Sequence, residues 1–341
     1  MRFAILGSGA IGSYIGAALA RGGAEVVLIA RGRQLEALRE HGVRVLSARG
    51  DFEARMPATD ELAAVADVDV VVIALKAYSL PEVAPRLGEL LAGETTVLPA
   101  QNGVPWWFFQ SFGDAYQGTV LESVDPGGIV SRSIDPSRVV GCVPYPATEL
   151  VAPGVVRHVE GTRFAIGEPD GALSDRCRAI ADSFVAGGLK CPIEPNIRGQ
   201  LWLKLIGNVA FNPTTALTGA TLGDLALVPE AVELARGIME ECASVGERLG
   251  IEMPVSIERR LEAGIAVGDH RTSMLQDLES GKPLEIDCLS GAVIEIAALL
   301  EIAVPQTRAV DAAVRLKAIL RERAGADPRA LPRVGTELPT A

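Results

Sequence analysis

The stretch RFAILGSGAIG, residues 2–12, decides the fold of this 341-residue chain. Residues 2–6 form a short, mainly apolar run that predicts a buried strand. Gly7, Gly9 and Gly12 follow as G-x-G-x-x-G, at the start of a helical segment over 10–21. In such a loop the first glycine permits a tight turn, the second lets the backbone approach a pyrophosphate, and the third lets helix and strand pack closely. We therefore expect a dinucleotide to be bound by Gly7, Ser8, Gly9, Ala10, Ile11 and Gly12. A purely structural glycine turn is the alternative.

Three further apolar runs, at 25–30, 69–75 and 94–98, alternate with helical segments. Continuous β-branched runs in this arrangement predict a parallel sheet that helices cover on both faces. Between 139 and 167, short segments with Pro, Gly and alternating Val predict added antiparallel strands, and one more strand–helix unit follows. These patterns predict an α/β Rossmann-type N-terminal domain over 1–195.

The composition becomes helical after residue 195. Helices are expected at 201–212, with an end at Asn212-Pro213, and at 229–249, 256–267, 272–279, 285–301 and 305–323. We therefore expect an all-α C-terminal domain over 196–323. The remainder, 324–341, is rich in Pro, Arg and Gly and predicts a loose tail.

The overall composition narrows the function classes. The net charge of −11 and the absence of a basic run argue against nucleic acid as a partner. Charges interrupt every long apolar stretch, so no membrane span is expected. The five cysteines are scattered and the three histidines lack ligand spacing, which predicts reduced thiols and no metal site. No signal peptide is expected either, so the predicted location is the cytoplasm.

The end of the second expected strand selects the type of dinucleotide. NAD-binding proteins usually place an acidic residue there, whereas this chain has Arg31, with Arg33 two residues on. A guanidinium at this place could pair with a 2′-phosphate, which favours NADP(H) over NAD. An ordinary solvated loop arginine is the alternative.

Polar side chains follow the third and fourth expected strands. Lys76 comes directly after one strand, and Asn102 lies in Gln101-Asn102-Gly103 after the next. Because the carboxyl ends of parallel strands line the ligand crevice, both could reach the nicotinamide end of a cofactor or a substrate. A solvated lysine and a turn-forming Asn-Gly are equally simple explanations.

The helix expected at 201–212 carries a polar stripe on a mostly apolar sequence. Lys204, Asn208 and Asn212 recur every four residues and therefore share one face. Burial would lower the pKa of the lysine toward neutrality and make it a usable general acid. The two amides suit an anionic, oxygen-rich substrate. The alternative is a helix that crosses a wet domain interface.

Two residues further along complete the candidate site. Ser273 could hydrogen-bond a substrate carboxylate, and Glu285 could anchor the catalytic ammonium or a cofactor hydroxyl. The alternative is that Ser273 only marks the start of a helix and that Glu285 only supplies an acidic residue to a first helical turn. The chain has no Tyr-x-x-x-Lys sequence, so the short-chain dehydrogenase mechanism lacks its residues.

Together these pieces resemble the ketopantoate reductase family. The matching pieces are GSGAIG at 7–12, Arg31, LKAY around Lys76, QNG around Asn102, LWLKLIGNVAFNP around Lys204, and SMLQDL and LEID around Ser273 and Glu285. The resemblance implies a Rossmann domain, then an all-α domain like the C-terminal domain of 6-phosphogluconate dehydrogenase, with the active site between them and NADPH as the hydride donor.

The resemblance also implies roles for individual residues. Lys204 would protonate the substrate carbonyl. Asn102 would touch both nicotinamide and substrate, as the third catalytic residue beside Lys204 and Glu285. Asn208, Asn212 and Ser273 would contact the substrate, whereas Lys76, Glu285 and Val124 would lie on the cofactor side.

Departures from the family leave the substrate open. Gly219 lies near the place of a family asparagine, and the segments 104–109 and 121–128 are unusual. The expected reaction is reduction of a small 2-oxo acid, by default ketopantoate to D-pantoate. Alternatives are a 3-hydroxy acid dehydrogenase of the 6-phosphogluconate-like group and an NADPH-binding sensor without turnover. A homodimer is the expected assembly.

Overall fold

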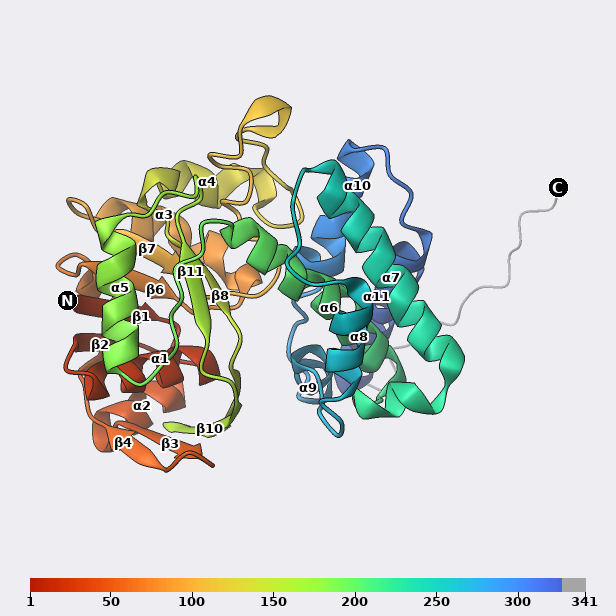
Figure 1. Ribbon diagram of the computed structural model, residues 1–341. Helices are drawn as coiled ribbons and strands as arrows, with labels where there is room; N and C mark the ends of the chain where they lie inside the picture. Colours follow the sequence, from red (N-terminus) through yellow and green to blue (C-terminus); the bar gives the residue numbers. More distant parts are fainter. Residues whose placement is uncertain (327–341) are drawn as a thin grey trace.

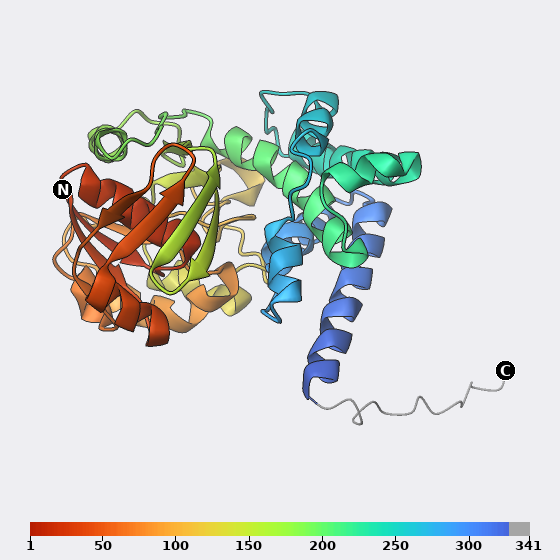
Figure 2. The ribbon, with the colours of Figure 1, turned by 90° about the horizontal axis from the view of Figure 1, so that it is seen from below.

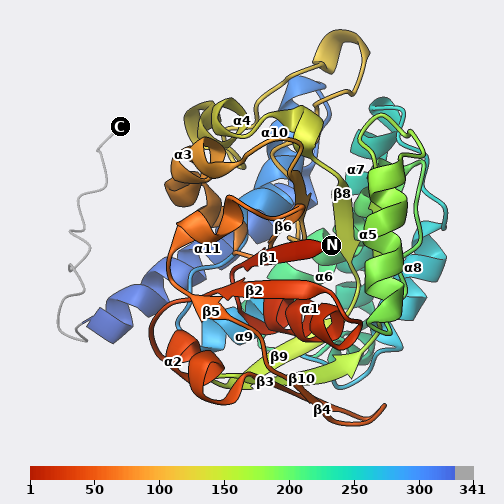
Figure 3. The same ribbon diagram turned by 90° about the vertical axis from the view of Figure 1, so that its left-hand side faces the viewer.

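The glycine loop follows the central strand of a five-stranded parallel sheet, in a computed structural model that describes residues 1–326 (Figure 1). The strand order is β5-β2-β1-β6-β7. The strands are β1 (Arg2–Leu6), β2 (Glu25–Ile29), β5 (Ala58–Thr59), β6 (Val70–Ile73) and β7 (Thr96–Pro99). Figure 3 shows β5, β2, β1 and β6 side by side. The parallel sheet expected from the four apolar runs is confirmed.

Side chains of the central strand alternate between two buried faces. Phe3 and Ile5 belong to the core packed by α1 (Ala10–Arg21) and α5 (Asp175–Ala186). Ala4 and Leu6 belong to the core packed by α3 (Leu80–Leu90) and α4 (Ile129–Ser133). Apolar residues on both faces are what a helix-covered parallel sheet requires. The helix α2 (Gly32–His41) follows β2.

Two smaller sheets extend this domain. A four-stranded sheet has the order β4-β3-β10-β9, and β8 pairs with β11 in an antiparallel ribbon. The strands are β3 (Val43–Ser47), β4 (Phe52–Ala54), β8 (Gly141–Pro144), β9 (Ala147–Ala152), β10 (Val155–Glu160) and β11 (Phe164–Gly167). The antiparallel pairing expected after residue 139 is confirmed by β8–β11 and β9–β10, whereas β3 and β4 were not expected.

Helices form the C-terminal part. They are α6 (Ile197–Thr218), α7 (Pro229–Arg248), α8 (Ile257–Ile265), α9 (Ser273–Glu279), α10 (Ala292–Leu299) and α11 (Pro305–Ala326). Figure 1 shows α6 running from the sheets into the helical part, where it packs on α7, α9 and α11. Its first half also contacts β8 and β11. Helix α6 therefore brings its residues to the junction between the sheets and the helical part. Figure 2 shows the last helix, α11, in dark blue, extending past the other helices.

The expected end of a helix at Asn212-Pro213 is wrong. Helix α6 continues through Pro213 to Thr218, and Gly219, whose φ is +79°, caps its C-terminal end. Proline at 213 has no backbone N–H to donate to the carbonyl four residues earlier, yet the helix continues without that one bond. Beyond it, Thr214 Oγ1 donates to the Ala210 carbonyl at 2.7 Å, and Thr215 Oγ1 donates to that of Phe211 at 2.9 Å.

Two more boundaries differ from expectation. The helix expected at 285–301 begins with a π-helical turn, Asp287–Gly291, before α10. Helix α11 runs to Ala326, so 324–326 are helical rather than loose. The rest of the expected tail, 327–341, lies outside the described residues. Within residues 1–326, no helix is long and apolar enough to cross a membrane, and no cluster of potential metal ligands occurs. All five cysteines are free and buried.

Candidate active site

The glycine loop between β1 and α1 has the shape that a pyrophosphate requires. Gly7 has φ +100°, and a side chain there would meet the backbone of Leu75; one at Gly12 would collide with the Gly7 carbonyl. A side chain at Gly9 would meet nothing within 4 Å. The fold thus demands glycine at the first and third positions, while the second leaves open space over the backbone. Gly9 also begins α1 without a side-chain cap or an acidic first turn, so an anion fits there.

A glutamine that sequence reasoning missed holds this loop. Gln34 Nε2 donates to the Ser8 carbonyl at 2.7 Å, and its Oε1 accepts from Gly154 N at 2.9 Å. Arg31 is the residue before α2, and Arg31 and Arg33 are both exposed beside the loop. Neither guanidinium forms a hydrogen bond with another described residue of the chain, so both are available to a ligand.

Lys76 joins the two parts of the chain. Its Nζ donates to Asp277 Oδ2 and to Glu285 Oε2, both at 2.7 Å, and Ala77 N donates to Glu285 Oε1 at 3.2 Å. Burial alone would lower the pKa of Lys76, but the charges and hydrogen bonds of both carboxylates outweigh it and raise that pKa above its ordinary value. Lys76 is therefore a fixed cation. Glu285 is hydrogen-bonded to Lys76 and not to Lys204, and Asp277 was given no role from the sequence.

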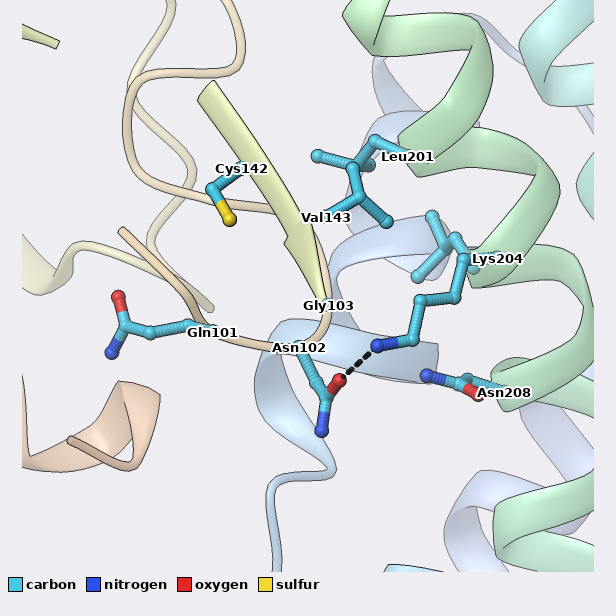
Figure 4. Close-up of a pocket in the computed structure, with 9 residues that line it drawn as sticks. Gln101, Asn102, Gly103, Cys142, Val143, Leu201, Lys204 and Asn208 are labelled. Atoms are coloured by element: carbon cyan, nitrogen blue, oxygen red, sulfur yellow. Dashed lines mark hydrogen bonds between the residues drawn. The ribbon is translucent and has the colours of Figure 1, made fainter. Parts of the chain in front are cut away.

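Lys204 meets Asn102 where α6 approaches the sheet (Figure 4). Lys204 Nζ donates to Asn102 Oδ1 at 2.7 Å and also to the Pro144 carbonyl. Burial lowers the pKa of Lys204 to about 8; the charge of Arg260 acts in the same direction, whereas Cys142 and Glu285 oppose it. The ammonium thus has neutral acceptors and a pKa near neutrality, as a proton donor requires.

A small pocket opens at this contact. Figure 4 shows Asn208 beside Lys204 on the same helix face. The pocket is lined by Gln101, Asn102, Gly103, Cys142, Val143, Leu201, Lys204, Leu205 and Asn208. It combines one ammonium and several amides with an apolar wall, which suits a small molecule that has both polar and aliphatic ends.

The other expected site residues lie at different distances from this pocket. Asn212 is buried one turn further along α6 and does not line the pocket. Ser273 is exposed at the start of α9, where Thr272 caps the helix instead. Val124 is half-buried, next to a segment tied to the helical part: Glu295 accepts from Glu122 N and Ser123 N at 2.8 and 2.9 Å.

The π-helical turn supports the loop that carries Asn102. Val104 N donates to the Cys288 carbonyl at 2.7 Å, and a side chain at Gly103, whose φ is +82°, would collide with that carbonyl. The hydrogen bond between Val104 N and the Cys288 carbonyl was not predicted from the sequence, in which the glycine at 103 is its only local indication. The aromatic segment 104–109 belongs to the core and does not line the pocket. Within this core, the ring centres of Phe108 and Trp202 lie 5.6 Å apart.

The fold and the site define a Rossmann-type oxidoreductase with a nicotinamide cofactor, and the comparisons with known proteins name the family. The family described as "Ketopantoate reductase PanE/ApbA" matches residues 3–171, and its C-terminal counterpart matches residues 196–318. The chain belongs to the ketopantoate reductase family.

Individual relatives cover nearly the whole chain. A 2-dehydropantoate 2-reductase of Mesorhizobium japonicum is 44% identical over 94% of this chain and 99% of its own length. One of Halobacterium salinarum is 32% identical over 93% of this chain and 98% of its own. The crystal structure of a PanE/ApbA family ketopantoate reductase from Ralstonia eutropha has a TM-score of 0.82 and 30% identity, and covers 94% of this chain and all of that one. The Rossmann-type fold followed by a helical domain is therefore confirmed.

Proposed function

We propose that the chain reduces ketopantoate (2-dehydropantoate) to D-pantoate with NADPH as the cofactor. The observation that carries the proposal is the contact between Lys204 Nζ and Asn102 Oδ1, which brings a proton donor of α6 to the carboxyl end of the sheet. The relatives named above give the substrate. The glycine loop, with its open space at Gly9, is where the pyrophosphate would lie.

Lys204 is the general acid in this proposal. NADPH, when bound, supplies the hydride that is added to C2 of the 2-oxo acid. Lys204 gives a proton from Nζ to the carbonyl oxygen, so that the product carries a hydroxyl group. A pKa of about 8 keeps Lys204 protonated near neutral pH and still able to release that proton. Its hydrogen bond to Asn102 points Nζ at the carboxyl edge of the sheet.

The remaining site residues take binding roles. Asn208 lines the pocket beside Lys204 and would bind the substrate; Asn212 and Ser273 would do so further out. On the cofactor side we place Lys76, Val124 and Glu285. Lys76 follows β6, whereas Asp277 and Glu285 belong to the helical part, so their ion pairs would also fix the helical part relative to the sheet.

The preference for NADPH rests on Arg31 and Arg33. Both are exposed next to the glycine loop, and β2 ends without the carboxylate that would bind a ribose 2′-hydroxyl. A guanidinium pairs well with a phosphate dianion, so these residues would select the 2′-phosphate.

Two further predictions concern the organisation of the chain. The boundary between the N-terminal and C-terminal domains is predicted at residue 195, and the chain is predicted to form a homodimer. Light scattering would test the homodimer.

The test is a comparison of substrates with the purified chain. NADPH oxidation is followed with ketopantoate, with other branched 2-oxo acids and with 3-oxo acids. We expect ketopantoate to give the highest kcat/KM. Faster turnover of a 3-oxo acid would favour a 3-hydroxy acid dehydrogenase, and NADPH binding without oxidation would favour a sensor; either result would overturn the proposal.

A further inference from the structure

Arg260 lies on α6 next to the catalytic lysine, although it belongs to α8. Its Nε donates to the Leu203 carbonyl at 3.4 Å, and its guanidinium carbon lies 5.9 Å from the centre of the Phe211 ring. The side chain is partly buried, and burial lowers the pKa of Arg260. Even so, a guanidinium keeps its charge at neutral pH.

Gly207 makes room for this guanidinium. A side chain at 207 would collide with the Nη2 and the central carbon of Arg260. Glycine inside a helix is less favourable than alanine, so its presence in α6 calls for a reason. The guanidinium takes the place of the missing side chain. On a helix that place borders the residues three and four positions away, which include Lys204.

No carboxylate compensates this charge. Within residues 1–326, Arg260 forms no ion pair, and Glu258 of the same helix lies 3.8 Å from Arg236 instead. Lys204 likewise has only the neutral oxygens of Asn102 and Pro144 as acceptors. The contrast with Lys76, which has two carboxylate partners, is clear. Arg260 lies outside the lining of the small pocket, on the neighbouring side of α6 beside Leu203 and Gly207. Two partly buried cations on one helix, neither with a carboxylate partner, would both be stabilised by an anion bound between them.

We propose that Arg260 binds the carboxylate of the 2-oxo acid while Lys204 faces its carbonyl. This inference rests on the proposed function, because it takes the reduced molecule to be a 2-oxo acid. Arg260 would thereby determine specificity: it selects substrates with a carboxylate next to the carbonyl. The guanidinium has N–H groups free for two parallel hydrogen bonds, the geometry in which it binds carboxylates best.

The test compares a charged and an uncharged substrate. Arg260→Gln is assayed with ketopantoate and with its primary amide, which keeps the carbonyl and loses the negative charge. We expect kcat/KM for the acid to fall about 10- to 100-fold, mainly through KM, because a charge-assisted hydrogen bond is lost. The value for the amide should stay within about twofold. Arg259→Gln is the matched control, since Arg259 is the adjacent residue and exposed.

Three results would overturn the inference. The first is equal loss with acid and amide, which indicates a structural role. The second is a shift of the alkaline limb of the kcat profile with no change in KM, which means that Arg260 acts only through Lys204. The third is behaviour like that of Arg259→Gln. NADPH affinity, followed by fluorescence, reports whether the variant is folded. If Arg260→Gln does not bind NADPH, Arg260→Lys replaces it, and it should discriminate between acid and amide less than the wild type does.

The two proposals fail differently. A wild-type enzyme that reduces no 2-oxo acid contradicts the proposed function. A wild-type enzyme that reduces ketopantoate, with an Arg260→Gln variant that loses as much on the amide as on the acid, contradicts only the role of Arg260.

Discussion

Lys204 and Asn102 form a hydrogen bond of 2.7 Å between α6 and the loop that follows β7. The proposed proton donor and the amide that would orient it therefore come from different parts of the chain. Their distance depends on how the helical part sits on the sheet, which the Lys76 and Glu295 contacts also fix. With these proposed roles, we expect catalysis to be sensitive to the junction as well as to the two side chains.

Replacing Lys204 by alanine should remove turnover and leave cofactor binding. The change deletes the proposed general acid, so kcat should fall by about 10²- to 10⁴-fold. The glycine loop is untouched, so the Kd for NADPH, measured by fluorescence quenching, should not change. Lys190→Ala, at an exposed lysine, is the control. Residual activity close to that of the control would show that Lys204 is not the acid.

The rate of reduction and the rate of the reverse reaction, oxidation, should change in opposite directions as the pH rises. Reduction needs the Lys204 ammonium, so kcat should fall as pH rises through about 8, the lowered pKa of that group. Oxidation of the 2-hydroxy acid needs the neutral amine, so its rate should rise over the same range. Initial rates in both directions from mild acid to alkaline pH would test this, and two limbs with the same sign would contradict the assignment.

Local patterns in the sequence predict the sheet and the stripe on α6 because these depend on neighbouring residues. Period and composition are enough for β1 and for the face shared by Lys204 and Asn208. The ion-pair partner of Lys76, in contrast, cannot be predicted from local sequence. Asp277 meets it only because two distant segments pack together, and nothing near either residue signals the contact. The continuation of α6 past Pro213 likewise has no local signal, because the packing of the helix on α7, α9 and α11 outweighs the one backbone hydrogen bond that proline removes.

Arg31 should determine the choice between the two dinucleotides. Arg31→Ala removes the proposed partner of the 2′-phosphate, so KM for NADPH should rise about 10- to 100-fold while KM for NADH changes little. Arg39→Ala, on the helix α2 that follows Arg31, is a control, since Arg39 contacts Asp60 instead. Equal effects on both cofactors would remove Arg31 from the 2′-phosphate site.

Lys76 should contribute to stability through its two carboxylates. Lys76→Met leaves Asp277 and Glu285, both largely buried, without their cation. We expect a loss of about 1–3 kcal/mol in the free energy of unfolding, less than for a fully buried pair because the Lys76 side chain is 36% exposed. Urea unfolding would measure it. The double variant Lys76→Met with Asp277→Asn should recover part of the loss, and no recovery would argue against repulsion between the carboxylates.

Gly103→Ala should damage catalysis through the position of Asn102. A methyl group there would collide with the Cys288 carbonyl and break the hydrogen bond from Val104 N, so the adjacent Asn102 must move. Displacing a catalytic group by about 1 Å can cost about 100-fold in rate, and we expect kcat to fall by about 10- to 100-fold. Gly113→Ala is a matched control, because Gly113 has nearly the same φ, +81°, but nothing within 4 Å of an added Cβ. It carries the same backbone strain without the collision. Equal kcat values for the two variants, with equal losses of thermal stability, would mean that the π-helical turn supports the fold and does not position Asn102.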